Sequence, residues 1–389
     1  MGWKETCAME ERFKFIEEFK QESDSLAELC RRYGISRKTG YKWLERYEEA
    51  GLVGLQDQSR APHSHPNQIA VDQEARILTV RSQHPTWGPV KVRAWLMRHD
   101  GAQAWPASST IGDILKRHGL TVPRKRKRRA SPHPGPLSHA EQPNAVWSAD
   151  FKGWFRVGDG NRCDPLTISD GFSRYLLRCQ GLAQPTDASV RPVFEATFRE
   201  YGLPDAIRID NGTPFASTAL GGLSSLSVWW IRLGIRVERI PPGQPQQNGR
   251  HERMHRTLKQ ETAQPPAETL RRQQERFDAF RIEYNQVRPH AALDHRTPAE
   301  CYHCSSRPFP SRIPEVEYHP DWEVRKVSHG CIRWWSKEVF VTRALEDEYV
   351  GLQPLDDRQL CVWFCSCPLG ILDQKTGRVH ADPTLAQLA

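Results

Sequence analysis

The sequence predicts a multidomain protein with an all-α N-terminal region, a central α/β domain with a mixed sheet, and a small β-barrel or sandwich at the C-terminus. Three observations predict this order. Residues 8 to 58 have helical spacing and capping signals, residues 144 to 302 alternate strand-like and helical segments, and residues 315 to 389 hold short apolar runs between turn residues. A chain of 389 residues has room for about two to four domains.

The composition favours a soluble protein with a polyanionic partner. The net charge is +8 with a pI near 9.0, and nucleic acid is the commonest partner for such a surface. No apolar run approaches the roughly 18 residues of a membrane helix, so we expect a cytoplasmic, nucleoid-associated protein without membrane contact. The ten scattered cysteines are expected to be reduced. The pair in Cys301-x-x-Cys304 has no second pair at finger-like spacing, so zinc is not expected.

The first predicted domain, residues 1–58, contains a helix-turn-helix in "SLAELCRRYGISRKTGYKWLERY". Ser25 with Glu28 predicts a capping box, Gly34 predicts the helix end, and Ser36 predicts the next cap. The second helix would present a polar and basic N-terminal face to DNA: Arg37, Lys38, Thr39 and Lys42. The alternative is an ordinary helical hairpin with a solvated basic face.

Two further residues of this helix carry predictions. Gly40 is unfavourable inside a helix by about 1 kcal/mol relative to Ala, which suggests a close backbone approach there. Tyr41 is expected on the buried face together with Trp43. After a linker, residues 69–122 form a second helix-turn-helix-like domain, in which Ser108 or Ser109 is the expected cap and Gly119 the expected stop.

Residues 123–143 are predicted to be a basic, Pro-rich linker. Like charges in a block repel one another and stay disordered unless an anion lies beside them. Such a run can resemble a nuclear-localisation signal, but its place between DNA-binding domains and the next domain favours a linker that follows phosphates. Its consecutive bases are Arg124, Lys125, Arg126, Lys127, Arg128 and Arg129.

The central domain, residues 144–302, places three acids where strands and a helix can bring them together. Asp150 lies within the apolar strand "AVWSADF", Asp210 ends the strand "AIRID", and Glu252 opens the helix after "QQNG". An unpaired buried carboxylate is costly, and a divalent cation offsets that cost. Three convergent acids would suit the oxygen ligation of Mg²⁺, and two ions about 3.5–4 Å apart can support phosphoryl transfer.

The helix that carries Glu252 also places Arg256 and Lys259 on the same face, where they could bind phosphates beside the scissile bond. The competing interpretation is a surface pair between Glu252 and Arg256 worth about 0.3–0.5 kcal/mol. The strand contexts of Asp150 and Asp210 favour the catalytic interpretation.

Five motifs resemble the core of DDE-type insertion-sequence transposases, relatives of the retroviral integrases. They are "WSADFKG", "SDGFSRY", "IDNGTPFAS", "PGQPQQNGRHERMHRTLK" and "YNQVRPHAALDHRTPAE". The resemblance implies a ribonuclease-H-like core in which Asp150, Asp210 and Glu252 bind two Mg²⁺ or Mn²⁺ ions. It also implies that Arg256 and Lys259 touch transposon-end DNA. The His/His/Cys/Cys zinc module of those integrases is absent from the sequence.

The resemblance implies a transposase that binds terminal inverted repeats, exposes a 3′-hydroxyl and joins it to target DNA as a homo-oligomer, dimer or tetramer. The alternative is a catalytically inert DNA-binding regulator derived from such an element. Asp170 matches another acid of the family, and we interpret it as a turn residue that bonds nearby backbone or Arg174. The basic and aromatic residues of the C-terminal domain, residues 315–389, would bind DNA or a partner subunit unless its aromatics form core: Arg333, Trp334, Trp335, Lys337 and Arg343.

Overall fold

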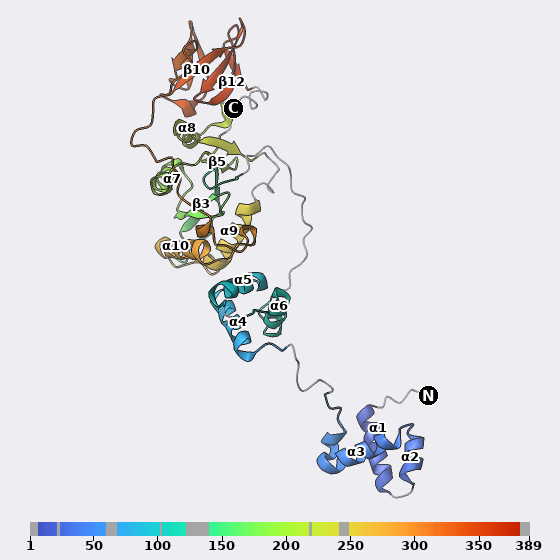
Figure 1. Ribbon diagram of the computed structural model, residues 1–389. Helices are drawn as coiled ribbons and strands as arrows, with labels where there is room; N and C mark the ends of the chain where they lie inside the picture. The colour runs from blue at the N-terminus through green and yellow to red at the C-terminus, as the bar shows by residue number, and fades with distance from the viewer. Residues whose placement is uncertain are drawn as a thin grey trace. The chain divides into compact units, whose positions relative to one another are not determined.

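The computed structural model describes residues 7–21, 24–59, 68–101, 103–121, 140–217, 220–240 and 249–381. The chain divides into two compact units, Met1–Ile69 and Ala70–Ala389 (Figure 1). The basic run 124–129 and most of the stretch before Glu252 lie outside the described residues. No helix in the described part of the chain is both long and apolar enough to cross a bilayer. None of the ten cysteines, all of which lie in the described residues, forms a disulfide in this structure.

The first unit contains a helix-turn-helix on a small apolar core. Its helices are α1 (Ala8–Lys20), α2 (Leu26–Arg32) and α3 (Arg37–Ala50), followed by the short helix η1 (Gly51–Leu55). Phe15, Leu29 and Trp43 are buried among them. The turn follows the sequence signals, because Gly34 has a φ of 64° and the Ser36 side chain accepts the Thr39 N–H at 3.1 Å.

Two expectations for this unit were wrong and one was confirmed. Ser25 precedes α2, but its hydroxyl donates to the Glu28 carboxylate instead of accepting a helical N–H, so no capping box forms. Tyr41 is 63% exposed, because Gly40 and Trp43 already occupy the buried face of α3. A Cβ at Gly40 would lie 2.6 Å from the Cys30 sulfur, so the predicted close approach is present.

The second unit begins with three helices: α4 (Val71–Gln83), α5 (Pro89–His99) and α6 (Ser108–Arg117). Ile77, Leu96 and Ile111 are buried within them. Ala107 precedes α6 and neither Ser108 nor Ser109 caps it, so the expected serine cap was wrong: both serines already lie in the first turn. Gly119 follows the helix with a φ of 68°, as expected for a stop.

The central domain is built on a six-stranded mixed sheet. Its strands are β1 (Val146–Phe151), β2 (Phe155–Arg156), β3 (Arg162–Asp170), β4 (Leu176–Leu182), β5 (Ala206–Ile209) and β6 (Arg236–Arg239). The order is β2-β3-β1-β5-β6, and β4 also pairs with β3. β1 is antiparallel to β3 and parallel to β5, which confirms the predicted mixed sheet.

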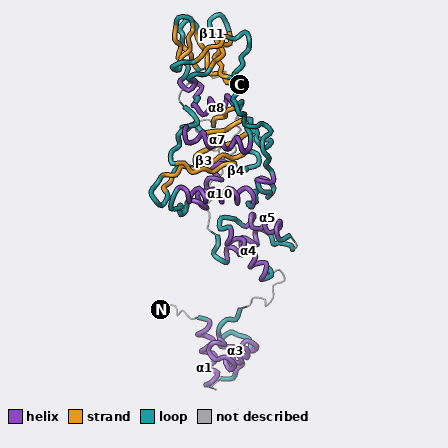
Figure 2. The backbone as a smooth tube through the Cα atoms, turned by 90° about the vertical axis from the view of Figure 1, so that its left-hand side faces the viewer, coloured by secondary structure: helices purple, strands orange, loops and turns teal. Residues whose placement is uncertain are grey.

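Helices cover both faces of this sheet (Figure 2). One face packs against α7 (Asp187–Tyr201) and α8 (Ser225–Arg232), and the other against α9 (Gly249–Thr262) and α10 (Leu270–Gln286). α10 begins at Leu270, because the Thr269 side chain caps it by accepting the Arg272 N–H. Short helices complete the chain: η2 (Leu220–Gly222), η4 (Ala291–Leu293), η5 (Pro298–Glu300) and η6 (Arg343–Leu345).

The C-terminal region forms two antiparallel sheets around one core. The strands are β7 (Glu323–Lys326), β8 (Cys331–Trp334), β9 (Lys337–Phe340), β10 (Tyr349–Pro354), β11 (Gln359–Phe364), β12 (Cys367–Asp373) and β13 (Arg378–His380). Five strands form one sheet, β13-β12-β11-β10-β7, and β8 pairs with β9. Closure of these sheets into a barrel stays a prediction. Trp334 is 4% exposed and belongs to the core, whereas Trp335 is 75% exposed.

Candidate active site

Asp150 lies on β1, and Asp210 directly follows β5, the parallel neighbour of β1. β1 and β5 pair with Trp147 opposite Ile207 and Ser148 opposite Arg208, and Asp150 and Asp210 each lie two residues further on. The side chains of Trp147, Ala149, Ile207 and Ile209 enter the core beneath α7 and α8. Side chains alternate between the two faces along a strand. Asp150 therefore points to the opposite face, which α9 covers, and Asp210 would do the same if the alternation of β5 continues for one more residue.

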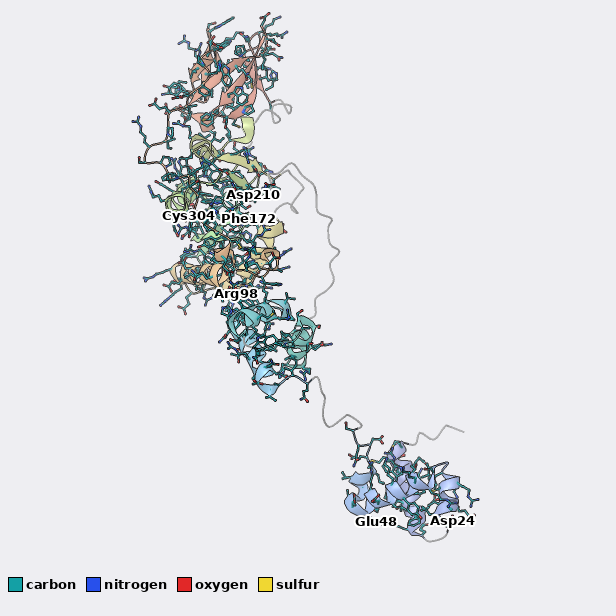
Figure 3. The ribbon with its side chains drawn as sticks, viewed as in Figure 1. Asp24, Glu48, Arg98, Phe172, Asp210 and Cys304 are labelled. Carbon is teal, nitrogen blue, oxygen red and sulfur yellow. The ribbon has the colours of Figure 1, made fainter. Side chains whose placement is uncertain are left out.

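The two acids differ in exposure. Asp150 is half-buried within β1, and Asp210 is exposed just after β5 (Figure 3). The Asp210 carboxylate accepts the N–H of Gly212 at 3.1 Å, and Asn211 donates to the carbonyl of Ile240 at 2.8 Å. These bonds fix the turn that carries Asp210 and keep its carboxylate at the end of the sheet.

Two histidines of α9 contact the strand pair that carries Asp150. Thr167 on β3 lies opposite Asp150, and its hydroxyl is 2.6 Å from Nε2 of both His251 and His255. Nδ1 of His255 lies 3.9 Å from Oδ2 of Asp150. Asp150, His251 and His255 thus form a group whose ligand atoms lie within 4.8 Å of one another, which could hold a metal ion.

Both histidines are uncharged at neutral pH. Burial lowers the pKa of His251 to about 4. Burial, with smaller contributions from His251 and Lys152, lowers the pKa of His255 to about 2. Neutral imidazole is the form that binds metal ions. Sequence reasoning missed this pair, although two histidines four residues apart on one helix face were the available signal.

Glu252 stands beside these histidines at the start of α9. It is exposed and makes no hydrogen bond or ion pair with any residue that the structure describes, so the alternative surface pair with Arg256 does not form there. Arg256 and Lys259 are exposed as well. The structure therefore places Asp150 on β1, Asp210 just after the neighbouring β5 and Glu252 in the first turn of α9, while no hydrogen bond or ion pair among the described residues joins Glu252 directly to either aspartate.

Asp170 is surrounded by hydrogen-bond donors that hold the local turn. It is buried and accepts hydrogen bonds from the Asn144 N–H at 2.8 Å, the Ser173 N–H at 2.7 Å and the Ser173 hydroxyl at 2.6 Å. Burial raises its pKa against the opposing effect of these bonds. The expected role as a turn residue bonded to nearby backbone is confirmed.

A second group that the sequence did not indicate lies on the other side of Asp150. Lys152 and Lys259 line one cavity of about 150 Å³ together with Trp154 and Leu258. Burial and the nearby charge of Lys259 lower the pKa of Lys152. Two lysines at one cavity, next to a strand that carries Asp150, are suited to an anionic group such as a phosphate.

The expected DNA-binding face of the first unit is accessible. Arg37, Lys38 and Lys42 are exposed at the start of α3, and Thr39 is half-buried with its hydroxyl 2.9 Å from that of Ser36. Tyr41 and Glu45 line the same surface hollow. The tyrosine thus lies beside the basic residues instead of in the core, where it could contact the same ligand.

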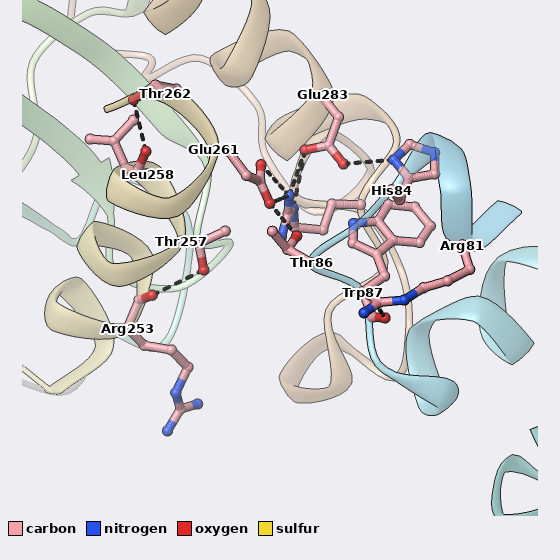
Figure 4. A network of polar contacts seen from close by, with 11 residues as sticks. Arg81, His84, Thr86, Trp87, Arg253, Thr257, Leu258, Glu261, Thr262 and Glu283 are labelled. Carbon is pink, nitrogen blue, oxygen red and sulfur yellow. Dashed lines mark hydrogen bonds and ion pairs between the residues drawn. The ribbon is translucent and has the colours of Figure 1, made fainter. Parts of the chain in front are cut away.

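A polar network around the buried Arg288 joins the loop between α4 and α5 to the far end of α9 (Figure 4). Arg288 donates to both carboxylate oxygens of Glu261, at 2.6 and 2.7 Å, and to Glu283 at 3.0 Å. The Thr86 hydroxyl donates to Glu261, and His84 lies 3.5 Å from Glu283. This network makes the second helical domain a contact partner of the helix that carries Glu252.

Comparison with known families finds matches along the chain. Two integrase core domain models match residues 140–245 and 233–298. A helix-turn-helix domain model matches residues 11–63, and a homeodomain-like domain model matches residues 39–115. The matched ranges cover the first helical unit, the second helical domain and the sheet with α9.

Relatives include two proteins of bacterial insertion elements. The chain is 28% identical over 247 residues to an uncharacterised 31.7 kDa protein of insertion element IS407 from Burkholderia multivorans, a match that covers 62% of this chain and 83% of the relative. It is 25% identical over 281 residues to a 39.2 kDa protein of insertion element IS476 from Xanthomonas euvesicatoria, covering 71% and 78%. Among solved structures, the magnesium complex of the HTLV-2 integrase catalytic core domain aligns with a TM-score of 0.34 and 16% identity, over 42% of this chain and 100% of that one.

Proposed function

We propose that this chain, which belongs to the insertion-sequence transposases of the integrase superfamily, binds the terminal inverted repeats of its element and catalyses metal-dependent 3′-end cleavage and strand transfer into target DNA. The observation that supports the proposal is that Asp150 lies on β1 and Asp210 directly follows β5, the parallel neighbour of β1, while Glu252 lies in the first turn of α9, which packs on this sheet. Three carboxylates that converge on bound metal ions would suit a reaction on phosphodiesters.

The residues at this place fit divalent cations. Asp150 is half-buried on β1, and its Oδ2 lies 3.9 Å from Nδ1 of His255, so a cation bound by both groups would stabilise the carboxylate. Asp150, Asp210 and Glu252 would hold two Mg²⁺ or Mn²⁺ ions through carboxylate oxygens, the ligands that these ions prefer. When bound, the ions would activate the attacking oxygen and stabilise the departing one.

The basic residues of the chain would hold the DNA. Arg256 and Lys259 are exposed on α9 beside Glu252, and Lys152 shares a cavity with Lys259. These cations would fix the phosphates on either side of the scissile bond, which is the main protein contribution in such reactions. The start of α3 would recognise the terminal repeats, and the basic run 124–129 would bind phosphates along the DNA backbone. A dimer or tetramer would hold two element ends together.

Substitution of Asp150 tests the proposal. Asp150→Asn should reduce Mg²⁺- or Mn²⁺-dependent cleavage and strand transfer of end DNA at least about a hundredfold, with end binding nearly unchanged. Asp205→Asn is the matched control, because Asp205 is an exposed acid one residue before β5 that pairs with Arg307. Equal activity of wild type and Asp150→Asn would remove Asp150 from the site. A wild type that binds ends without cleaving them would favour the inert regulator instead.

A further inference from the structure

A small buried cluster of polar side chains joins α9 to the sheet next to Asp150. Thr167 is fully buried, His251 is 3% exposed and His255 is 6% exposed. Ser169 completes the cluster, with its hydroxyl 3.2 Å from Nδ1 of His251. Buried polar groups of this kind normally satisfy all their hydrogen bonds, so the direction of each bond can be worked out.

The Thr167 hydroxyl determines those directions, because it has one proton. It donates to the carbonyl oxygen of Asp150 at 3.1 Å. In the arrangement in which this bond is made, Nε2 of His251 and Nε2 of His255, each 2.6 Å away, both donate to the hydroxyl oxygen. Both imidazoles are therefore protonated on Nε2 and carry a lone pair on Nδ1.

The two Nδ1 atoms have different surroundings. Nδ1 of His251 can accept the proton of the Ser169 hydroxyl at 3.2 Å. Nδ1 of His255 makes no hydrogen bond with a described residue and lies 3.9 Å from Oδ2 of Asp150. A lone pair that faces a carboxylate in a buried place is unfavourable unless a cation lies between them.

The distance suits that arrangement. Nitrogen and oxygen ligands lie about 2.0–2.2 Å from a metal ion, so two ligands of one ion are roughly 3–4 Å apart. The separation of 3.9 Å falls within that range and is too long for a hydrogen bond.

We infer that His255 is a metal ligand of this site through Nδ1, alongside Asp150, and that His251 orients it through Thr167 without binding the metal. The inference rests on the proposed function for the metal role of Asp150. It extends the set of three acids by a nitrogen donor. Imidazole favours transition metals over Mg²⁺, so the site should take Mn²⁺ or Co²⁺ more tightly than Mg²⁺.

Pulsed electron paramagnetic resonance of the full-length protein with Mn²⁺ tests this directly, since it detects nitrogen bound to the ion. Wild type should show ¹⁴N coupling, and biosynthetic labelling with ¹⁵N-histidine should convert it to ¹⁵N coupling without any substitution. His255→Gln should lose the coupling and His251→Gln should keep it. Calorimetry should show Mn²⁺ affinity falling at least about tenfold in His255→Gln, with a smaller change for Mg²⁺.

The outcomes separate this inference from the proposed function. Suppose that Mn²⁺ binds wild type but not Asp150→Asn, and that the spectrum shows no coupling to a histidine nitrogen. This result would overturn the ligand role of His255 alone. A hydrogen-bonded, positioning role for His255 would give that same result. Mn²⁺ binding that is absent from wild type, or unaffected by Asp150→Asn, would overturn the metal role of Asp150 and with it both proposals.

Discussion

Nη2 of Arg288 donates to both carboxylate oxygens of Glu261, at 2.6 and 2.7 Å, although Arg288 is only 2% exposed. Glu283 accepts from the same guanidinium, so two carboxylates surround one buried cation. The pair links the last turn of α9 to the chain just after α10. Its position next to Thr86 and His84 means that the second helical domain rests on a buried charge cluster.

Removal of the cation should destabilise this unit. Arg288→Met would leave Glu261 and Glu283 without their buried counter-charge, and breaking such a cluster costs about 3–5 kcal/mol. Urea unfolding should measure a loss of this order in the free energy of unfolding. Arg271→Met is the control, since Arg271 is an exposed residue of α10 paired with Glu275. Equal stability of the two variants would contradict a structural role for the cluster.

Lys91 should make the stability depend on pH. Burial, helped by the charge of Arg288, lowers its pKa to about 8 from 10.5. Between these values the unfolded chain binds more protons than the folded protein, so stability should rise with pH from about 8 to 10.5. Below pH 8 the whole cost of the buried charge is present, and Lys91→Met should stabilise the protein at pH 7 by about 1–3 kcal/mol.

The difference between wild type and Lys91→Met, followed by urea unfolding from pH 7 to 10.5, isolates this residue. Lys116→Met, at an exposed position in the last turn of α6, should give a difference that does not change with pH. A wild type and a Lys91→Met variant with parallel stability profiles would show that the lysine is not desolvated.

Arg256 should contribute to binding of the cut end. Arg256→Ala should weaken that binding and lower the slope of log affinity against log salt by about 0.9, the value for one phosphate contact. Fluorescence anisotropy with end DNA at several salt concentrations measures both quantities. Arg271→Ala, which removes an equal charge from α10, should leave the slope unchanged. Affinity that is the same as wild type at every salt concentration would count against a phosphate contact.

The start of α3 should carry recognition of the element end. The double variant Lys38→Ala and Lys42→Ala removes two exposed cations and should lower the salt slope by about 2, with the fold unchanged. Lys14→Ala, on α1 and paired with Glu11, is the matched control. If the control weakens end binding as much as the double variant, the effect comes from net charge and not from this helix face.

Local signals predicted much of the fold. Gly34, Ser36 and Gly119 mark turns whose geometry depends on the residue itself, and the structure has these turns at the predicted positions. The apolar alternation in β1 and β5 also sets the face of Asp150. Tyr41 and Ser25 were misjudged because helix burial and cap bonding depend on neighbours, and Gly40, Trp43 and Glu28 decide those positions.

The contacts of the candidate site were harder to predict. His255 reaches Asp150 only because α9 packs across β1 and β3, with Thr167 between the two histidines. Nothing in the spacing of Thr167 and His255 along the chain indicates that contact. Arg288 likewise lies far in sequence from Thr86, and its burial depends on how α5 meets α9 and α10.

The helix α9 has Glu252 in its first turn and Glu261 near its end. These residues are nine positions apart, about 13 Å along a helix axis. A helix of this length transmits displacement without bending much, and Glu261 near its far end accepts hydrogen bonds from Thr86, in the loop between α4 and α5, and from Arg288, just after α10. A pull on the second helical domain from bound DNA would therefore act on the same helix that carries Glu252.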